Sequence, residues 1–268
     1  LAVYSHHAYT QGTPKKYKVQ RAVYACEFWL PECKPLVLAR RCLKGWDKLV
    51  PPQPAAPMPR DLAWVCAVFA TLLGNPGAGL AMLVSFDAWL RISEVAGLRA
   101  RDVVDTRDHA DEVMHGVSVF LPKTKTGRRQ AVRIEDPAVA DLLVAWRDAC
   151  GARHGENAQL FPDPPDLRAA LARSLGLFRV DAHGLAFTWH SFRHGGASRA
   201  YLSGMMMADV LLRGRWKVES SGRHFVQSGR QLLLTLALPL EVTTIAGQIA
   251  RVGLRQLFAD DLAARLDS

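Results

Sequence analysis

Long apolar runs and clustered cysteines are both missing from this sequence. The longest apolar stretch, LLLTLALPL at residues 232–240, contains Pro239 and is too short to span a bilayer. No secretory signal opens the chain. The five cysteines include no CxxC pair, which argues against a zinc site and against a disulfide framework. We therefore expect reduced thiols, no metal, no cofactor and no membrane association.

Acidic residues are scarce relative to basic ones. The 268 residues include 34 Lys and Arg against 25 Asp and Glu, so the formal net charge is +9 and the pI is about 9.6. This excess favours a polyanionic partner, most often nucleic acid. With 49% hydrophobic residues, the chain can bury one large core, or a small core followed by a larger one.

The chain divides at a proline-rich segment. Residues 1–50 have a helical pattern, and PPQPAAPMP at 51–59 predicts an extended linker. Beyond it, the residues that alternate and are rich in valine (113–121 and 130–134) predict a β-hairpin with Gly127 in the turn. Helices are expected at 60–73, 78–90, 137–150 and 166–177, after His190, near Met206, and from Arg230 to the end. The expected fold class is mainly α with a small antiparallel β-sheet.

Two segments carry charged residues that could bind phosphate, and each also has an ordinary explanation. In LRISEVAGL, Arg91 and Glu94 are three residues apart and would share one side of a helix. They form either a surface ion pair or an arginine held for bidentate phosphate binding. In PKTKTGRR, Lys123 and Lys125 would face the same side of a strand that enters a turn. They are either a solvated basic tip or a phosphate contact.

A third segment, FTWHSFRHGGAS, could place a histidine and an arginine at the start of a helix. His190 and Arg193 are three residues apart, in a first turn that Thr188 would cap. Backbone N–H groups at a helix N-terminus favour an anion there. Gly195 and Gly196 weaken the helix, and a reason to keep them is close approach of DNA or of another helix.

A fourth segment, LLRGRWKVESSGRHF, places Trp216 in a turn and Phe225 nine residues later. Taken alone, both could be core residues. Together, the four segments resemble the tyrosine recombinase (phage integrase) family over residues 60–230. The resemblance lies in the order of the motifs: Arg and Glu, a hairpin Lys, HxxR, then Trp with an aromatic residue nine positions later. FRHGGAS with GRWKVESS is most similar to the recombinases of eukaryotic mobile elements, the DIRS-type and Crypton groups. The segment LPECKPLVLARRCLKGWDKLVPP extends that similarity towards residue 28.

This resemblance implies a tyrosine-recombinase catalytic domain with a C-terminal helical tail over residues 60–268. Residues 1–50 would be part of the helical core-binding domain that, with the catalytic domain, clamps duplex DNA. The family reaction needs no metal and no nucleotide. A tyrosine hydroxyl attacks the scissile phosphate, which gives a 3′-phosphotyrosyl bond and a free 5′-hydroxyl. The implied partners are double-stranded DNA and other copies of the chain, which would form a homotetramer on the DNA through the C-terminal helix. The amphipathic stretch 245–257 is suited to that contact. A nuclear location would follow for a eukaryotic mobile element, and a cytoplasmic or nucleoid one otherwise.

The resemblance also assigns roles to individual residues. Arg91 and Arg193 would hold the non-bridging oxygens of the phosphate and stabilise the transition state. Lys125 would protonate the leaving 5′-oxygen, with Lys123 as the alternative. Glu94 would orient Arg91 or His190. His190 would assist proton transfer, and Trp216 would bind phosphate through its indole N–H. Position 225 completes the implied catalytic set. Further DNA contacts are expected from Lys123, Arg128, Arg129, His194 and Arg215.

The nucleophile position is where the sequence departs from the family. Phe225 has no oxygen to attack with, and no other tyrosine is placed to substitute for it. We therefore expect a chain that binds and positions DNA without cleaving it. An engineered Tyr→Phe change in an otherwise complete recombinase is favoured, because every other catalytic position is intact. The alternative is a natural, domesticated DNA-binding protein. A metal-dependent nuclease is disfavoured, because the aspartates between residues 102 and 111 have no matching basic or histidine partner and are expected in a solvated loop.

Overall fold

The computed structural model describes residues 1–11, 16–50, 55–107, 115–123, 127–180 and 186–258. The chain divides into two compact units, Leu1–Pro54 and Ala55–Ser268. The division falls inside the proline-rich segment that the sequence marks as a linker. Each unit has a core of its own, and each is described separately below.

The first unit is a small helical bundle. It consists of α1 (Ala2–Thr10), α2 (Lys16–Trp29), the 3-10 helix η1 (Pro31–Cys33) and α3 (Val37–Leu49). Val19 and Val23 of α2 are buried with Leu43 of α3 in its core. Glu27 is also buried, and its carboxylate accepts hydrogen bonds from Arg40, at 2.8 and 2.6 Å. This pair of a buried Glu27 and a half-exposed Arg40 ties α2 to α3, because a carboxylate removed from water needs such a partner.

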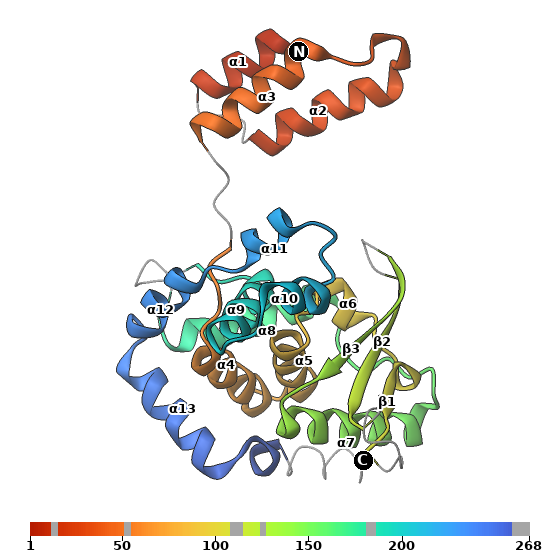
Figure 1. Cartoon of the computed structure of the whole chain (residues 1–268), viewed down its shortest axis with the longest axis vertical. Coiled ribbons are helices and arrows are strands. Elements are labelled where there is room, and N and C mark those ends of the chain that lie inside the picture. The colour runs from red at the N-terminus through yellow and green to blue at the C-terminus, as the bar shows by residue number, and fades with distance from the viewer. Residues whose placement is uncertain (12–15, 51–54, 108–114, 124–126, 181–185, 259–268) are drawn as a thin grey trace. The chain divides into compact units, whose positions relative to one another are not determined.

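The second unit is mostly helical and carries one small sheet (Figure 1). Its helices are α4 (Arg60–Leu72), α5 (Pro76–Asp87), α6 (Ile92–Ala96), η2 (Ala100–Asp102), α7 (Pro137–His154), α8 (Pro164–Leu177), α9 (Trp189–Leu202), α10 (Met207–Gly214), α11 (Glu219–Phe225), α12 (Ser228–Leu236) and α13 (Leu240–Val252). Its strands are β1 (Val103–Asp105), β2 (Val117–Lys123) and β3 (Arg128–Ile134). The prediction of a mainly α fold with a small antiparallel sheet is confirmed.

Helix α5 is the central element of the second unit. It contains no charged residue before Asp87, and its residues from Pro76 to Phe86 are all buried. Helices α4, α7, α8 and α9 pack around it, which is why its sequence is apolar on every side. The predicted helix over 78–90 ends earlier, at Asp87, because Trp89 adopts a left-handed backbone with φ of 52°. That conformation is rare for a bulky residue, and it turns the chain into the candidate site.

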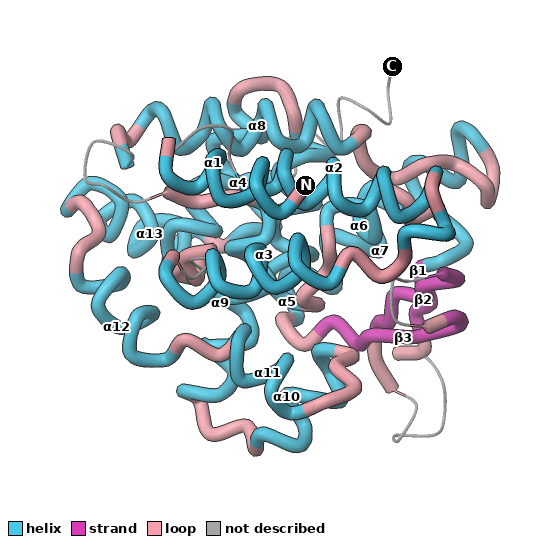
Figure 2. Tube along the Cα trace, turned by 90° about the horizontal axis from the view of Figure 1, so that it is seen from above, coloured by secondary structure: helices cyan, strands magenta, loops and turns pink. Residues whose placement is uncertain are grey.

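The sheet is antiparallel, with strand order β1-β2-β3, and lies at one side of the helices (Figure 2). The predicted hairpin is present as β2 and β3, and residues 124–126 of its turn lie outside the described residues. Strand β1 was not predicted. Four aspartates, at positions 102, 105, 108 and 111, were expected in a solvated loop, and the last two lie outside the described residues. The expectation is wrong for the first two. Asp102 is buried and accepts the N–H of Arg99 at 3.0 Å, and Asp105 is paired with Arg107 at 2.7 Å.

The second half of the predicted linker is part of the second unit. Residues 55–59 form neither helix nor strand, but Met58 is fully buried and its N–H donates to the carbonyl oxygen of Ser191 at 2.9 Å. Gln231 of α12 donates to the Met58 carbonyl at 3.2 Å. A Cβ on Gly195 would lie 2.1 Å from that same oxygen. Gly195 is therefore needed for close approach of this segment, and the DNA alternative is not required to explain it.

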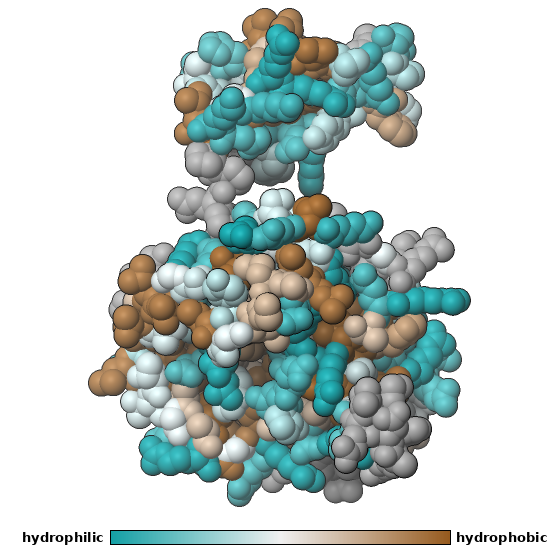
Figure 3. All heavy atoms as spheres, in the orientation of Figure 1, coloured by the Kyte–Doolittle hydropathy of each residue, from teal (hydrophilic) through white to brown (hydrophobic). Residues whose placement is uncertain are grey.

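The C-terminal helical region is broken at Pro239 into α12 and α13, where one stretch from Arg230 was predicted. The apolar side of α13 packs on α4 of the same unit, with Val242, Ala246 and Ile249 buried. This packing occupies part of the stretch 245–257 that was expected to dock on a neighbouring protomer. At the corner between α12 and α13, four other side chains remain 54 to 84% exposed, and apolar atoms gather there in Figure 3. They are Leu232, Leu233, Leu236 and Leu240.

In the described part of the chain, no single helix is long and apolar enough to cross a membrane. Only two segments taken together, Glu219–Leu236 and Leu240–Val252, have the length and composition of a membrane span, and the chain bends by 104° between them.

Candidate phosphate-binding site

Arg91 and Glu94 meet at the start of α6. Arg91 is the residue before the helix, and Glu94 is the third residue inside it. The N–H of Arg91 donates to Glu94 Oε2 at 2.9 Å, and its Nη1 donates to Oε1 at 2.5 Å. The Glu94 side chain is 4% exposed and that of Arg91 19%. The two residues do form a pair, in which the Glu94 side chain caps the N–H of Arg91 at the helix start, and they are not two positions on one helix face.

Among the described residues, three arginines converge on the Glu94 carboxylate. Besides Arg91, Arg215 Nη2 lies 2.8 Å from Oε2, and Arg193 Nη1 lies 3.9 Å from the same oxygen. They come from three separate places in the sequence: the end of α10 supplies Arg215, and α9 supplies Arg193. One carboxylate faces three guanidinium groups, so the described cluster carries a surplus of positive charge away from bulk water.

Arg193 is held by backbone carbonyl groups. It is completely buried, and its Nη1 donates to the Trp89 carbonyl at 2.5 Å, while its Nη2 donates to the Gly214 carbonyl. Burial first, and then the charges of Arg91 and Arg215, lower the pKa of Arg193 to about 9. The left-handed backbone at Trp89 thus aims a carbonyl at a buried cation, and this fixes the direction of the guanidinium plane.

The segment from Gly214 to Trp216 delivers three groups to the site. Gly214 supplies the carbonyl for Arg193, and Arg215, with φ of 56°, turns its side chain to Glu94. The Trp216 ring lies over the backbone of Gly214, where a Cβ would be 1.8 Å from the ring. Burial is the largest cause that lowers the pKa of Arg215 from its ordinary value. Each residue of the GRW sequence therefore has a contact in the site, and Gly214 cannot carry a side chain beside the Trp216 ring.

Several buried N–H donors of this site have no acceptor among the described residues. They are Arg193 Nε, Arg215 Nε and Nη1, and Trp216 Nε1. A buried donor without an acceptor costs roughly 1–3 kcal/mol. Four such donors in one place, next to surplus positive charge, indicate a site for an anion that has several oxygen atoms.

Phe225 lies beside this cluster at the end of α11, where its ring contacts several other side chains. Its ring stacks on His194 with centroids 4.4 Å apart and an interplanar angle of 20°. The Trp216 ring is 4.7 Å away, the His190 ring 5.3 Å away, and the Arg193 guanidinium carbon 5.4 Å from the ring centroid. The structure therefore brings the predicted nucleophile position together with His190, Arg193 and Trp216.

The two histidines of HxxRH have different surroundings. His190 is exposed at the start of α9, whereas His194 is 1% exposed. Burial is the main cause that lowers the pKa of His194 to about 4. Its Nδ1 lies 3.2 Å from the Phe225 carbonyl oxygen and 2.9 Å from Gln227 Nε2. The DNA contact predicted for His194 stays a prediction, and the structure shows a contact that the sequence did not indicate, since the His194 ring stacks on Phe225.

The basic hairpin is described only in part. Lys125 lies outside the described residues. Lys123 ends β2 opposite Arg128, the first residue of β3, and their backbones are in register. Arg129 has an exposed side chain on a backbone with φ of 52°. Arg215, which was expected among the DNA contacts, is buried and paired with Glu94.

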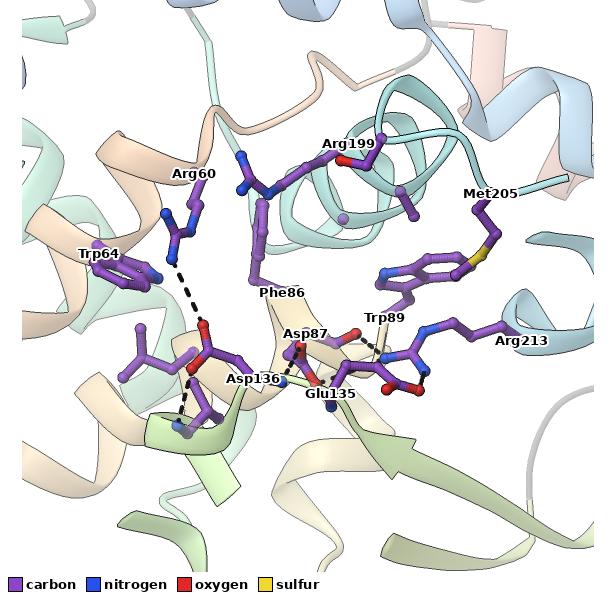
Figure 4. A pocket seen from close by; sticks show the side chains of 15 residues that line it. Arg60, Trp64, Phe86, Asp87, Trp89, Glu135, Asp136, Arg199, Met205 and Arg213 are labelled. Atoms are coloured by element: carbon purple, nitrogen blue, oxygen red, sulfur yellow. Dashed lines mark hydrogen bonds and ion pairs between the residues drawn. The ribbon is translucent and has the colours of Figure 1, made fainter. Parts of the chain in front are cut away.

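Trp89 also lines a cavity of about 200 Å³ (Figure 4). Its lining includes Arg213, which contacts Asp87 at 3.6 Å and Glu135 at 2.7 Å and lies over the Trp89 ring, 5.2 Å from its centroid. Burial raises the pKa of Asp87 to about 6. The Trp89 ring is 2% exposed and also stacks on Trp216, with centroids 6.1 Å apart. These contacts hold Trp89 in place while its carbonyl binds Arg193. The sequence alone did not single out Trp89, although it lies two residues before Arg91.

No protein-family model matches the chain, and no curated protein matches it. Solved structures do resemble it. XerA recombinase superposes with a TM-score of 0.51 and 15% identity, over 85% of this chain and 85% of that chain. The Tn1549 transposon integrase, in a tyrosine-to-phenylalanine variant in complex with transposon right end DNA, gives 0.50 and 16% identity, over 84% of this chain and 86% of that chain. At this identity the likeness is one of fold. The chain therefore has the tyrosine-recombinase catalytic-domain fold, with a helical body and a three-stranded antiparallel sheet.

Proposed function

We propose that this chain binds double-stranded DNA at a strand-transferase site of the tyrosine-recombinase kind. In this site, Phe225 occupies the position of the nucleophile. The chain would hold a phosphodiester in place for cleavage and leave it intact. Its relatives in fold support this proposal, since one of them is a recombinase and another is an integrase bound to transposon-end DNA.

The observation that carries the proposal is the surplus of donors and positive charge beside Phe225. Three arginines share one carboxylate, and four buried N–H groups lack an acceptor among the described residues. A phosphodiester supplies oxygen acceptors together with the negative charge that the cluster lacks. Guanidinium groups match phosphate oxygens in pairs, so this pocket suits a phosphate better than a carboxylate or a neutral amide.

Each residue would have a distinct task in holding the phosphate. Arg91 and Arg193 would bind the non-bridging oxygens, and Glu94 would orient Arg91 through its 2.5 Å contact. The exposed His190 would donate to the phosphate, and Trp216 would do so through its indole N–H. Lys125 would protonate the leaving oxygen in a cleaving form, with Lys123 as the alternative. Lys123, Arg128 and Arg129 would add phosphate contacts from the hairpin.

The chemistry stops at Phe225 for a simple reason. In a cleaving form, a tyrosine oxygen bonds to phosphorus while the bond from phosphorus to the 5′-oxygen breaks, and that oxygen takes up a proton. Phe225 keeps the ring that stacks on His194 but supplies no oxygen. Binding without cleavage follows from this one missing atom.

Two origins of Phe225 predict the same behaviour of this chain. The first is an engineered Tyr→Phe change in the recombinase of a mobile element, which would act in the nucleus if the host is eukaryotic. The second is a natural, domesticated DNA-binding protein. Reading codon 225 of the parent gene distinguishes them, since a tyrosine codon there removes the second origin.

Assembly on DNA would use the corner between α12 and α13. The apolar face of α13 is already covered by α4, so the exposed leucines at positions 232, 233, 236 and 240 are the better contact for a second copy. We expect a DNA-bound homo-oligomer, with a tetramer as the complete assembly. Light scattering with and without DNA tests this, and a Leu236→Glu change should leave DNA-bound monomers.

The proposal is tested by measuring DNA affinity over a range of salt concentrations. The chain should bind duplex DNA with a logarithmic salt slope of roughly −0.9 for each phosphate contact. Arg91→Gln should weaken binding to a duplex that carries the recognition site. The same change at Arg223, an exposed residue paired with Glu219, is the matched control and should have little effect. Affinity for duplex DNA no greater than that of a neutral protein would contradict the proposal.

A further inference from the structure

Arg215 has contacts that a surface DNA-binding residue would not have. Its side chain is 4% exposed, and its Nη2 donates to Glu94 Oε2 at 2.8 Å and lies 3.3 Å from the Trp89 carbonyl oxygen. The Trp89 carbonyl is also the acceptor for Arg193. The two buried arginines therefore share one backbone acceptor, and with Arg91 they share one carboxylate.

The contact between Arg215 and Glu94 changes what the other arginines can do. Glu94 Oε2 accepts from the Arg91 backbone and from Arg215, and it lies 3.9 Å from Arg193. Without Arg215, this oxygen would attract Arg193 more strongly and would repel a phosphate nearby. With Arg215 in place, the Glu94 charge is balanced, and Arg193 keeps a free Nε.

Arg215 also retains binding capacity of its own. Its Nε and Nη1 have no acceptor among the described residues, and both are buried. A residue with a purely structural ion pair would be expected to satisfy its remaining donors. The left-handed backbone at Arg215, with φ of 56°, is a further cost that a surface contact would not require.

We propose that Arg215 is a third arginine of the phosphate-binding site. It balances Glu94 and gives N–H donors to the same phosphate that Arg91 and Arg193 bind. The inference rests on the proposed function for the identity of the phosphate, which is that of a DNA backbone. The inference goes beyond the proposed function because it places Arg215 inside the phosphate-binding site, to which the sequence pattern assigns only Arg91 and Arg193.

Binding of orthovanadate to the unsubstituted Phe225 chain tests this without any cleavage. Orthovanadate resembles phosphate and adopts the five-coordinate geometry of a phosphoryl-transfer transition state, and titration calorimetry measures its affinity directly. Arg215→Gln should weaken binding on the order of 10- to 100-fold, the effect of losing hydrogen bonds to a charged group. Arg215→Lys keeps a charge near Glu94 without the forked donors, so it should show an intermediate loss.

Two controls separate this role from a structural one. Arg91→Gln should weaken orthovanadate binding as a positive control, whereas Arg223→Gln, at an exposed arginine, should change it less than about threefold. Thermal unfolding shows whether each variant is folded. The inference is overturned if folded Arg215→Lys or Arg215→Gln binds orthovanadate as tightly as the unsubstituted chain while Arg91→Gln does not.

The same titrations separate this inference from the proposed function. If the chain binds orthovanadate through Arg215 but does not bind duplex DNA, then the phosphate site is real and the proposed function is wrong. If it binds DNA while Arg215→Gln leaves both affinities unchanged, the proposed function stands and the role of Arg215 is refuted. Loss of both affinities in Arg215→Gln, with its fold retained, supports both.

Discussion

Replacing Glu94 by glutamine should destabilise the folded chain strongly. The change keeps the shape of the side chain and removes the only carboxylate that the structure describes in contact with Arg91, Arg193 and Arg215. Three guanidinium groups would then repel one another, and two of them are almost completely buried. Breaking a buried ion pair by removing one partner costs roughly 3–5 kcal/mol. We expect a loss of that size in the free energy of unfolding.

The assay is urea unfolding, with Glu219→Gln as the matched control. Glu219 also pairs with an arginine, Arg223, but both side chains are more than half exposed, at 54% and 70%. An exposed pair contributes about 0–1 kcal/mol, so the control should unfold almost like the unsubstituted chain.

Added phosphate gives a second measurement of the same effect. A bound anion would replace the charge that Glu94→Gln removes, so phosphate should stabilise this variant more than chloride does at equal ionic strength. Equal stability of the two glutamine variants, or no difference between phosphate and chloride, would refute the idea that Glu94 balances the arginine cluster.

Three further changes test other parts of the account. Phosphate affinity should fall as pH rises through about 9, because Arg193, whose pKa lies near 9, then loses the proton that binds the anion. As pH falls from 6.5 towards 4, the unfolded chain binds a proton that the buried His194 does not bind. Urea unfolding should therefore show a stability loss from His194 of up to about 3 kcal/mol, and His194→Phe should lose that much less over the same range. Gly195→Ala, whose Cβ would meet the Met58 carbonyl at 2.1 Å, should cost about 3 kcal/mol, whereas Gly176→Ala, with open space around its Cβ, should be neutral or stabilising.

The fold could be predicted from the sequence where local patterns decide it. The uninterrupted apolar residues of α5 require a buried helix, and the valine alternation of β2 requires a strand. Element ends were less predictable when tertiary contacts set them. Helix α5 ends early because the backbone turns at Trp89, next to the site. Strand β1 is only three residues long, which is too short to show an alternating pattern in the sequence.

The candidate site could be predicted in its members more than in its geometry. The spacing of Arg91, His190, Arg193, Trp216 and Phe225 identifies residues that the structure does bring close together. Spacing does not show burial or contacts within the protein, however. His194 and Arg215 were expected among the DNA contacts, and the sequence indicated no partner within the chain for either residue.

His194 is stacked on Phe225, and Arg215 is paired with Glu94 from another element. Neither contact is local in the sequence. The carbonyl of Trp89 is a backbone group, and its role depends on a left-handed φ that no side-chain pattern reveals.

The central proposal is that the chain has a strand-transferase site that lacks the nucleophilic oxygen at position 225, and covalent trapping on a nicked suicide duplex tests it most directly. The ends of the parent element supply the candidate recognition site, and the chain is compared with its Phe225→Tyr variant. We predict that both bind the duplex and that only Phe225→Tyr forms a protein–DNA adduct resistant to SDS. If both bind and neither forms an adduct, the strand-transferase account is contradicted, and a DNA-binding protein without recombinase chemistry takes its place.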